Sequence, residues 1–255
     1  MPSMTMLIWW TGTLLEIIIL ARGYQQRLTR QFPIFYAYLL FVTLDEFVRI
    51  SFYRWDPNHY SQVYWVTQYI CLALGAGIIF EIYRVALRSY PGAARMTRYM
   101  LVVVFAAIVV KTLTMPSGDL FAWLASTSLV LERNLRIVQA LAMLTLVSLF
   151  VWYAIPFGRN LKGILIGYGL FIAMSILQFA LWYYSWDRFK PFWTYAETSS
   201  YLVVLGVWVN TLWSSEPLHE AQPVNQFESD YQSLVASTRE QFRRTLARLG
   251  WVVRA

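Results

Sequence analysis

The sequence predicts an all-α integral membrane protein with seven transmembrane helices, and three observations lead to this prediction. Of its 255 residues, 58% are hydrophobic and only 14% are charged, against about 25% charged residues in soluble domains. Seven apolar stretches approach or reach the length of about 20 residues that a helix needs to cross a bilayer. Lys and Arg are also concentrated in alternate loops, as expected for a chain that crosses a membrane repeatedly.

The seven apolar stretches define the expected spans in order along the chain. They are residues 7–21, 32–52, 63–83, 99–115, 131–155, 161–182 and 192–213. The first and fourth are the shortest, so we expect them to extend into their flanks. Residues 1–6 contain no Lys or Arg, and we therefore expect the first stretch to be a retained span rather than a cleaved signal peptide.

The basic residues predict the orientation of the spans, because Lys and Arg of short loops are held on the cytoplasmic side. Nine lie in or beside the loops that would be cytoplasmic: Arg22, Arg27, Arg30, Arg84, Arg88, Arg95, Arg98, Arg159 and Lys162. The opposite loops contain Arg54, Arg188 and Lys190. We therefore expect the N-terminus outside and the C-terminus in the cytoplasm, with the bacterial inner (plasma) membrane as the location.

The composition changes after the last span, which divides the chain into a membrane domain, 1–215, and a cytoplasmic tail, 216–255. Apolar residues of the tail recur at spacings of three and four, as in an amphipathic helix: Phe227, Tyr231, Leu234, Thr238, Phe242, Leu246 and Leu249. Arg239, Arg243, Arg244 and Arg248 fall mainly on the other face. We favour a helix that lies on the inner leaflet, and the alternative is a connector that binds a protein partner through residues 226–251.

Short sequence words recur between the two halves of the membrane domain. YLLF at 38–41 and YRWD at 53–56 are followed later by YGLF at 168–171 and YSWD at 184–187. Both sets run in the same direction, so they indicate two three-helix bundles joined by the fourth span, a 3+1+3 parallel repeat. In that case Trp55 and Trp186 would occupy equivalent positions. The alternative is a chance recurrence of short apolar words.

Charged and polar residues within the expected spans are the best indication of a site, because burying a charge in a membrane costs at least about 2.5 kcal/mol. The candidates for a ligand-binding site are Asp45, Glu46, Arg49, Glu132, Arg136, Gln139, Glu197 and Tyr201. Spacings of three and four place several of them on common helix faces. The pattern predicts a polar cavity that opens to the outside.

Two interpretations of these residues remain open. In the first, they neutralise one another as ion pairs within a helix, Asp45 with Arg49 and Glu132 with Arg136. In the second, the same residues also bind a small molecule, and the aromatic residues interleaved with them would suit an amphipathic or aromatic ligand. The lone acid Glu16 would pair across to another helix or to a second subunit.

Glu81 and Arg84 lie one turn apart at the cytoplasmic end of the third span. The pair resembles the acid and arginine at the same place in rhodopsin-like receptors, which implies a role in cytoplasmic coupling. The alternative is an arginine that only extends toward the headgroups.

Several function classes are disfavoured by the residues that the chain contains. The 45–49 segment, DEFVR, resembles the Glu-Glu-x-x-x-Arg motif of CAAX-type intramembrane proteases, but its arginine is one residue too close, and the sequence has no HExxH, GxSxG or P-loop motif. With the single cysteine Cys71 and two histidines, His59 and His219, we expect no metal site, no cofactor and no enzymatic activity. The net charge of +7 is explained by the cytoplasmic loops, so we expect no nucleic-acid partner.

Seven helices in a 3+1+3 arrangement resemble the architecture of microbial rhodopsins and of SWEET and PQ-loop transporters, over residues 7–213. The last span, however, has no lysine for retinal, and the first span of each half has no proline. We therefore expect a receptor or sensor-like module that binds a small ligand from outside. The alternatives are a small-solute transporter and a non-catalytic subunit of a larger membrane complex.

Overall fold

The computed structural model describes residues 3–114, 120–152 and 158–213, together with 229–230, 232–233, 235–238, 240–241 and 243 of the tail. Its helices are α1 (Ser3–Gln25), α2 (Leu28–Gln31), α3 (Pro33–Trp55), α4 (Pro57–Ala86), α5 (Pro91–Leu113), α6 (Leu120–Trp152) and α7 (Arg159–Thr211). The described part of the chain contains no β-strand. The all-α fold class is therefore confirmed.

Five of these helices contain stretches that are long and apolar enough to cross a membrane. They are Leu7–Gln25, Pro57–Ala86, Gly92–Thr112, Val130–Trp152 and Arg159–Leu181. α3 is as long as α5 but contains the charged residues Asp45, Glu46 and Arg49, and Ser199–Thr211 at the end of α7 is a shorter apolar helix. These properties support a helical membrane protein with five candidate spans, two fewer than the sequence predicted.

Large apolar side chains cover much of the outer surface of the bundle. Val103 on α5 is 66% exposed and Leu144 on α6 is 63% exposed, and both helices have further exposed valines or leucines. A soluble monomer rarely exposes contiguous apolar surface of this kind. The surface is suited to contact with the acyl chains of a bilayer.

Proline starts three of the long helices, because its fixed φ suits the first helical position and its missing N–H has no intrahelical partner there anyway. Pro33, Pro57 and Pro91 each occupy this position, in α3, α4 and α5. The connections before them are short, and the one between α3 and α4 consists of Asp56 alone. These tight connections make consecutive helices antiparallel neighbours.

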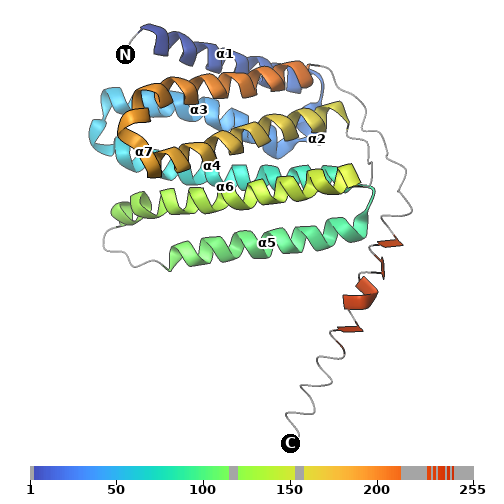
Figure 1. The fold of residues 1–255 in the computed structure, drawn as a ribbon. Coiled ribbons are helices and arrows are strands. Elements are labelled where there is room, and N and C mark those ends of the chain that lie inside the picture. The colour runs from blue at the N-terminus through green and yellow to red at the C-terminus, as the bar shows by residue number, and fades with distance from the viewer. Residues whose placement is uncertain are drawn as a thin grey trace, which may run out of the picture.

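The long helices form an antiparallel bundle in which α5 lies at one edge (Figure 1). α4 contacts α3, α5, α6 and α7, and α1 contacts α3 and α7. The N-terminus and the α3–α4 turn lie at one end of the bundle, whereas α2, the α4–α5 connection and the start of α7 lie at the other. The second end is therefore the one that contains Arg27, Arg88 and Arg159.

α7 differs from the prediction, because residues 183–191 were expected to be a loop between two spans and are helical instead. At about 1.5 Å per residue a straight helix of this length would reach about 80 Å, but Figure 1 shows α7 folding back into two antiparallel legs. The first leg starts at Arg159 and the returning leg ends at Thr211. One helical element thus supplies both of the last two predicted segments.

Two glycines allow the legs of α7 to approach closely. A Cβ atom at Gly163 would overlap Thr211, and one at Gly167 would overlap the indole of Trp208. These two glycines are four residues apart, which is the small-xxx-small pattern that lets membrane helices pack backbone to backbone. Trp208 is completely buried in this contact.

We expect Gly167→Ala to lower the free energy of unfolding by about 1–3 kcal/mol, because the new methyl group must displace the buried indole of Trp208. The matched control is Gly206→Ala in the returning leg, where a Cβ atom meets no neighbour. That substitution should raise the stability by about 0.5–1 kcal/mol, as alanine stiffens a helix interior. Thermal denaturation in detergent measures both; equal effects would contradict close packing of the two legs.

Other predicted boundaries need smaller corrections. The expected span 99–115 is shorter than α5, so the predicted loop at 88–98 is mostly helical. α6 begins at Leu120 rather than at 131. Glu132 therefore lies about 18 Å along its helix and not at its start, which places it near the middle of the bundle.

The repeat and the tail remain predictions. The side chain of Trp186 lies outside the described residues, and so do most apolar and basic positions of the predicted tail helix. The described tail residues are helical and mostly exposed.

Candidate functional site

The centre of the bundle contains a line of charged and amide side chains, here called the central polar network, from three helices. Its members are Asp45 and Arg49 of α3, Gln68 of α4, and Glu132, Arg136 and Gln139 of α6. Acids and bases alternate along the line, and the two carboxylates balance the two guanidinium groups. This balance lowers the cost of placing the network inside a membrane.

The two ion pairs predicted within single helices are confirmed. Nη2 of Arg49 lies 2.7 Å from Oδ2 of Asp45, and Nη2 of Arg136 lies 3.3 Å from Oε1 of Glu132. In each pair the residues are four positions apart on one helix face. Asp45 and Arg136 are both more than nine-tenths buried, so neither charge is well solvated.

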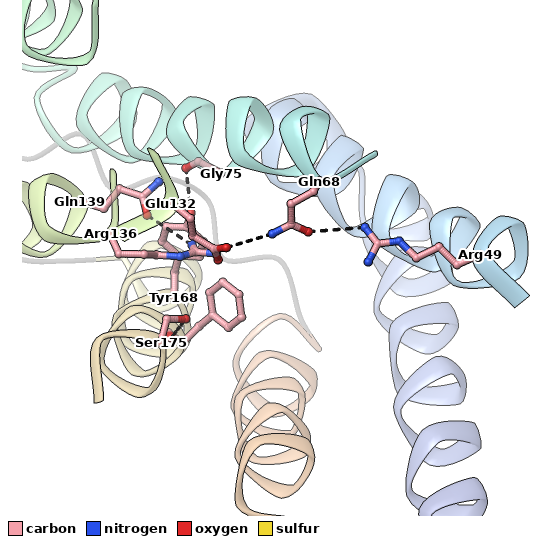
Figure 2. Close-up of polar contacts among 9 residues, drawn as sticks. Arg49, Gln68, Gly75, Glu132, Arg136, Gln139, Tyr168 and Ser175 are labelled. Atoms are coloured by element: carbon pink, nitrogen blue, oxygen red, sulfur yellow. Dashed lines mark hydrogen bonds and ion pairs between the residues drawn. The ribbon is translucent and has the colours of Figure 1, made fainter. Parts of the chain in front are cut away.

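Gln68 joins the two ion pairs across the bundle, as Figure 2 shows. Its Oε1 accepts a hydrogen bond of 3.5 Å from Arg49, and its Nε2 donates one of 3.1 Å to Glu132. An amide suits this place because it can accept from a cation and donate to an anion at the same time. Thr67 adds a second acceptor for Arg49, at 2.9 Å.

Arg136 connects the central polar network to α7. Besides Glu132 it donates to Oε1 of Gln139 at 3.3 Å, and its guanidinium carbon lies 4.6 Å from the centre of the Phe171 ring. Phe171 belongs to the first leg of α7, so this cation–π contact ties α6 to α7. The Nε atom of Arg136 and Oδ1 of Asp45 are buried and have no hydrogen-bond partner within the described part of the protein.

Tyr168 fastens the first leg of α7 to α4 beside this network (Figure 2). Its hydroxyl donates a hydrogen bond of 2.8 Å to the carbonyl oxygen of Gly75. A Cβ atom at position 75 would lie only 2.9 Å from that hydroxyl oxygen, so the contact depends on glycine. Both residues are buried.

A second group of polar residues, here called the lateral cluster, lies between α1, α3 and the returning leg of α7. It consists of Thr13, Glu16, Thr43, Glu46 and Tyr201. The carboxylate of Glu16 accepts hydrogen bonds from Thr43 at 2.7 Å and from Tyr201 at 2.5 Å, and Glu46 accepts one from Thr13 at 2.9 Å. Glu16 is fully buried, so the lone acid of the first span pairs with other helices of the same chain.

The predicted site residues are therefore divided between two places. Asp45, Arg49, Glu132, Arg136 and Gln139 belong to the central polar network. Glu46 and Tyr201 lie in the lateral cluster instead, because Glu46 shares a face of α3 with Thr43 rather than with Asp45. The side chain of Glu197 lies outside the described residues.

Sequence reasoning missed Gln68, Thr67 and Tyr168. For Gln68 a signal was present, since an amide inside an otherwise apolar span needs a partner as a charge does. Tyr168 carried no such signal, because a tyrosine in an apolar helix is equally compatible with plain packing.

Glu81 is held by the backbone of α3. Its two carboxylate oxygens accept hydrogen bonds from the N–H groups of Ile34 and Phe35, at 3.0 Å and 2.8 Å. Arg84 lies 3.5 Å from the same carboxylate, with half of its side chain exposed. The acid of the predicted coupling pair is thus the N-terminal cap of a neighbouring helix, while the coupling role itself remains a prediction.

For two cavities every lining residue is described, and neither lining contains a member of the central polar network. One, of about 360 Å³, is lined by residues of α3, α4 and α5 that include Glu81 and Arg84. The other, of about 210 Å³, is lined almost entirely by apolar residues of α4, α5 and α6. The outward polar cavity stays a prediction. Among the described residues no three His, Cys, Asp or Glu side chains are grouped so that they could hold a metal ion.

No protein-family model matches the sequence, and no curated protein or solved structure matches it either.

Proposed function

We propose that the chain spans the membrane seven times, with the N-terminus outside. In this arrangement α1, α3, α4, α5 and α6 each cross once, and α7 supplies the last two crossings through its two legs. The proposal is supported by the alternation of helix direction in Figure 1 and by the single end at which the basic connections gather. The tail then lies in the cytoplasm.

Cysteine labelling tests this orientation. We expect a cysteine at Ser89, in the α4–α5 connection, to resist an impermeant maleimide in intact cells, and one at Asn58, just after the α3–α4 turn, to react. Both variants are made with Cys71→Ala, because Cys71 is the single native cysteine. Modification at position 89 with protection at position 58 would mean that the orientation is reversed.

We further propose that the protein is a receptor or sensor-like module, with the central polar network as the place where a small ligand acts. The observation that carries this proposal is the connection of three helices through one line of polar contacts, which α7 joins through Phe171. A ligand that bonds to any member changes the contacts between helices, and this gives it a way to shift their positions. Asp45 Oδ1 and Arg136 Nε offer an acceptor and a donor that no other described residue uses.

The chemistry of the network indicates the class of ligand. Its charges are balanced, so an ion would leave an uncompensated charge in the membrane, whereas a neutral or zwitterionic molecule would not. The guanidinium carbon of Arg49 lies 4.5 Å from the centre of the Tyr64 ring, so aromatic surface adjoins the polar line. We therefore expect a small neutral or zwitterionic ligand with an apolar part.

A transporter is the second candidate. The continuity of the helices is unlike one common transporter design. Transporter sites are often formed by helices that unwind at mid-membrane. α3, α4 and α6 run through the central polar network as continuous helices. The third candidate, a subunit of a larger complex, would use the exposed apolar surface as a protein contact.

A thermal-shift comparison tests the receptor proposal. The purified chain is screened with zwitterionic amino acids and small neutral aromatic compounds, and a binder should raise Tm. Gln68→Glu should abolish that rise, because a third carboxylate disturbs the charge balance, while Gln25→Glu, at the exposed last residue of α1, should leave it unchanged. Binding that persists in Gln68→Glu would place the ligand elsewhere.

A further inference from the structure

The larger cavity, of about 360 Å³, lies at the basic end of the bundle, where α3 begins, α4 ends and α5 begins. Its volume is within the range of small-molecule sites, about 300–1,000 Å³. Glu81, Arg84 and Arg98 are its charged lining residues, and Ile34, Phe80 and Leu101 contribute to its apolar lining. The cavity thus combines two guanidinium groups with an apolar wall.

The carboxylate in this lining compensates the two arginines only in part, because it forms one long ion pair, with Arg84. Both oxygens of Glu81 accept hydrogen bonds from backbone N–H groups at the start of α3, where the helix dipole also favours a negative charge. Arg84 is 3.5 Å from that carboxylate, which is long for a charged hydrogen bond, and its side chain is 51% exposed. Arg98 is exposed and forms no ion pair among the described residues. Arg98, together with the half-exposed Arg84 and its long contacts to Glu81 and the Gln31 carbonyl, therefore leaves the lining with more positive than negative charge to offer an anion.

The surroundings of the cavity favour an amphiphile over a free ion. Val102 belongs to the lining, and with Val103 it forms part of the exposed apolar surface of α5. That surface would face acyl chains in a bilayer. Basic pockets between helices on the cytoplasmic side of membrane proteins bind anionic lipid headgroups for the same combination of reasons.

We infer that this cavity binds an anionic phospholipid of the leaflet at the basic end. Arg84 and Arg98 contact the phosphate, and Ile34, Phe80 and Leu101 contact the first carbons of the acyl chains. The inference is independent of the ligand proposed for the central polar network. It would hold even if that network served only stability.

Lipid titration followed by native mass spectrometry of the full chain in detergent tests the inference. Phosphatidylglycerol is expected to bind with a stoichiometry of one at low concentration, and phosphatidylcholine is not. The double variant Arg84→Gln/Arg98→Gln should bind phosphatidylglycerol roughly 30-fold more weakly, since each arginine near an anionic headgroup contributes about fivefold. Its Tm without lipid should match that of the unmodified chain, which shows that it folds.

The matched control is Arg88→Gln/Arg95→Gln, which removes two exposed arginines from the same end without changing the cavity lining. We expect the affinity of this variant for phosphatidylglycerol to stay within about twofold of that of the unmodified chain, because exposed charges outside the contact contribute little. An equal loss in both double variants would overturn the inference in favour of general surface attraction. Tm is also measured with phosphatidylglycerol and with inorganic phosphate. If phosphate alone raised Tm as much as the lipid does, the inference would be overturned, because the site would then recognise a free anion.

Discussion

Replacing Arg136 by alanine should lower the free energy of unfolding by about 3–5 kcal/mol, the cost of leaving a buried charge without its partner. Glu132 would lose its ion pair, Gln139 its donor and Phe171 its cation. Denaturation in detergent, with Tm or the chemical midpoint as the readout, measures the loss. Because the side chain of the remaining Glu132 is only 19% exposed, solvent offers its charge little compensation.

Arg133→Ala is the matched control, since Arg133 has the same charge three residues earlier on α6 but is exposed. Its effect should stay within about 0.5 kcal/mol. The double variant Glu132→Gln/Arg136→Met should recover part of the loss, because it leaves no uncompensated carboxylate. If Arg136→Ala were no worse than Arg133→Ala, the central polar network would not contribute to the fold.

Periodicity and charge spacing predicted much of what lies within single helices. The all-α class follows from the long apolar stretches, because a chain segment in a membrane must satisfy its backbone hydrogen bonds internally, as a helix does. The Asp45–Arg49 and Glu132–Arg136 pairs follow from a spacing of four on one helix face. These features are local, so no knowledge of the bundle was needed. The exact ends were less predictable: residues 183–191 contain turn-compatible and charged residues, yet they stay helical while α7 reverses direction.

Features that depend on contacts between helices were harder to predict. The distribution of Asp45 and Glu46 between two clusters follows from the rotation of α3, because adjacent residues on a helix point about 100° apart. Nothing in the sequence states which neighbour each face meets. Gly163 and Gly167 formed a recognisable packing pattern, but their partners, Thr211 and Trp208, could be identified only once α7 was seen to fold back.

Loss of the contact by which Glu81 caps the start of α3 should also strongly lower the free energy of unfolding. The first residue of α3 is Pro33, which has no N–H, and Phe32 before it provides no side-chain cap. The N–H groups of Ile34 and Phe35 therefore depend on the carboxylate that α4 supplies. Each buried donor left without an acceptor costs about 1–3 kcal/mol, so Glu81→Leu should destabilise the protein by about 2–6 kcal/mol.

Glu81→Gln retains one carbonyl oxygen and should cost less than Glu81→Leu, while Asp56→Asn, in an exposed pair with His59, should change stability by less than about 1 kcal/mol. Hydrogen exchange supplies a local readout: the amides of Ile34 and Phe35 should exchange faster in Glu81→Leu than any change in global stability explains. Unchanged exchange there would contradict the capping role. If Glu81→Gln instead keeps normal stability but abolishes a ligand response measured at the tail, the residue transmits a signal as well as fixing the start of α3.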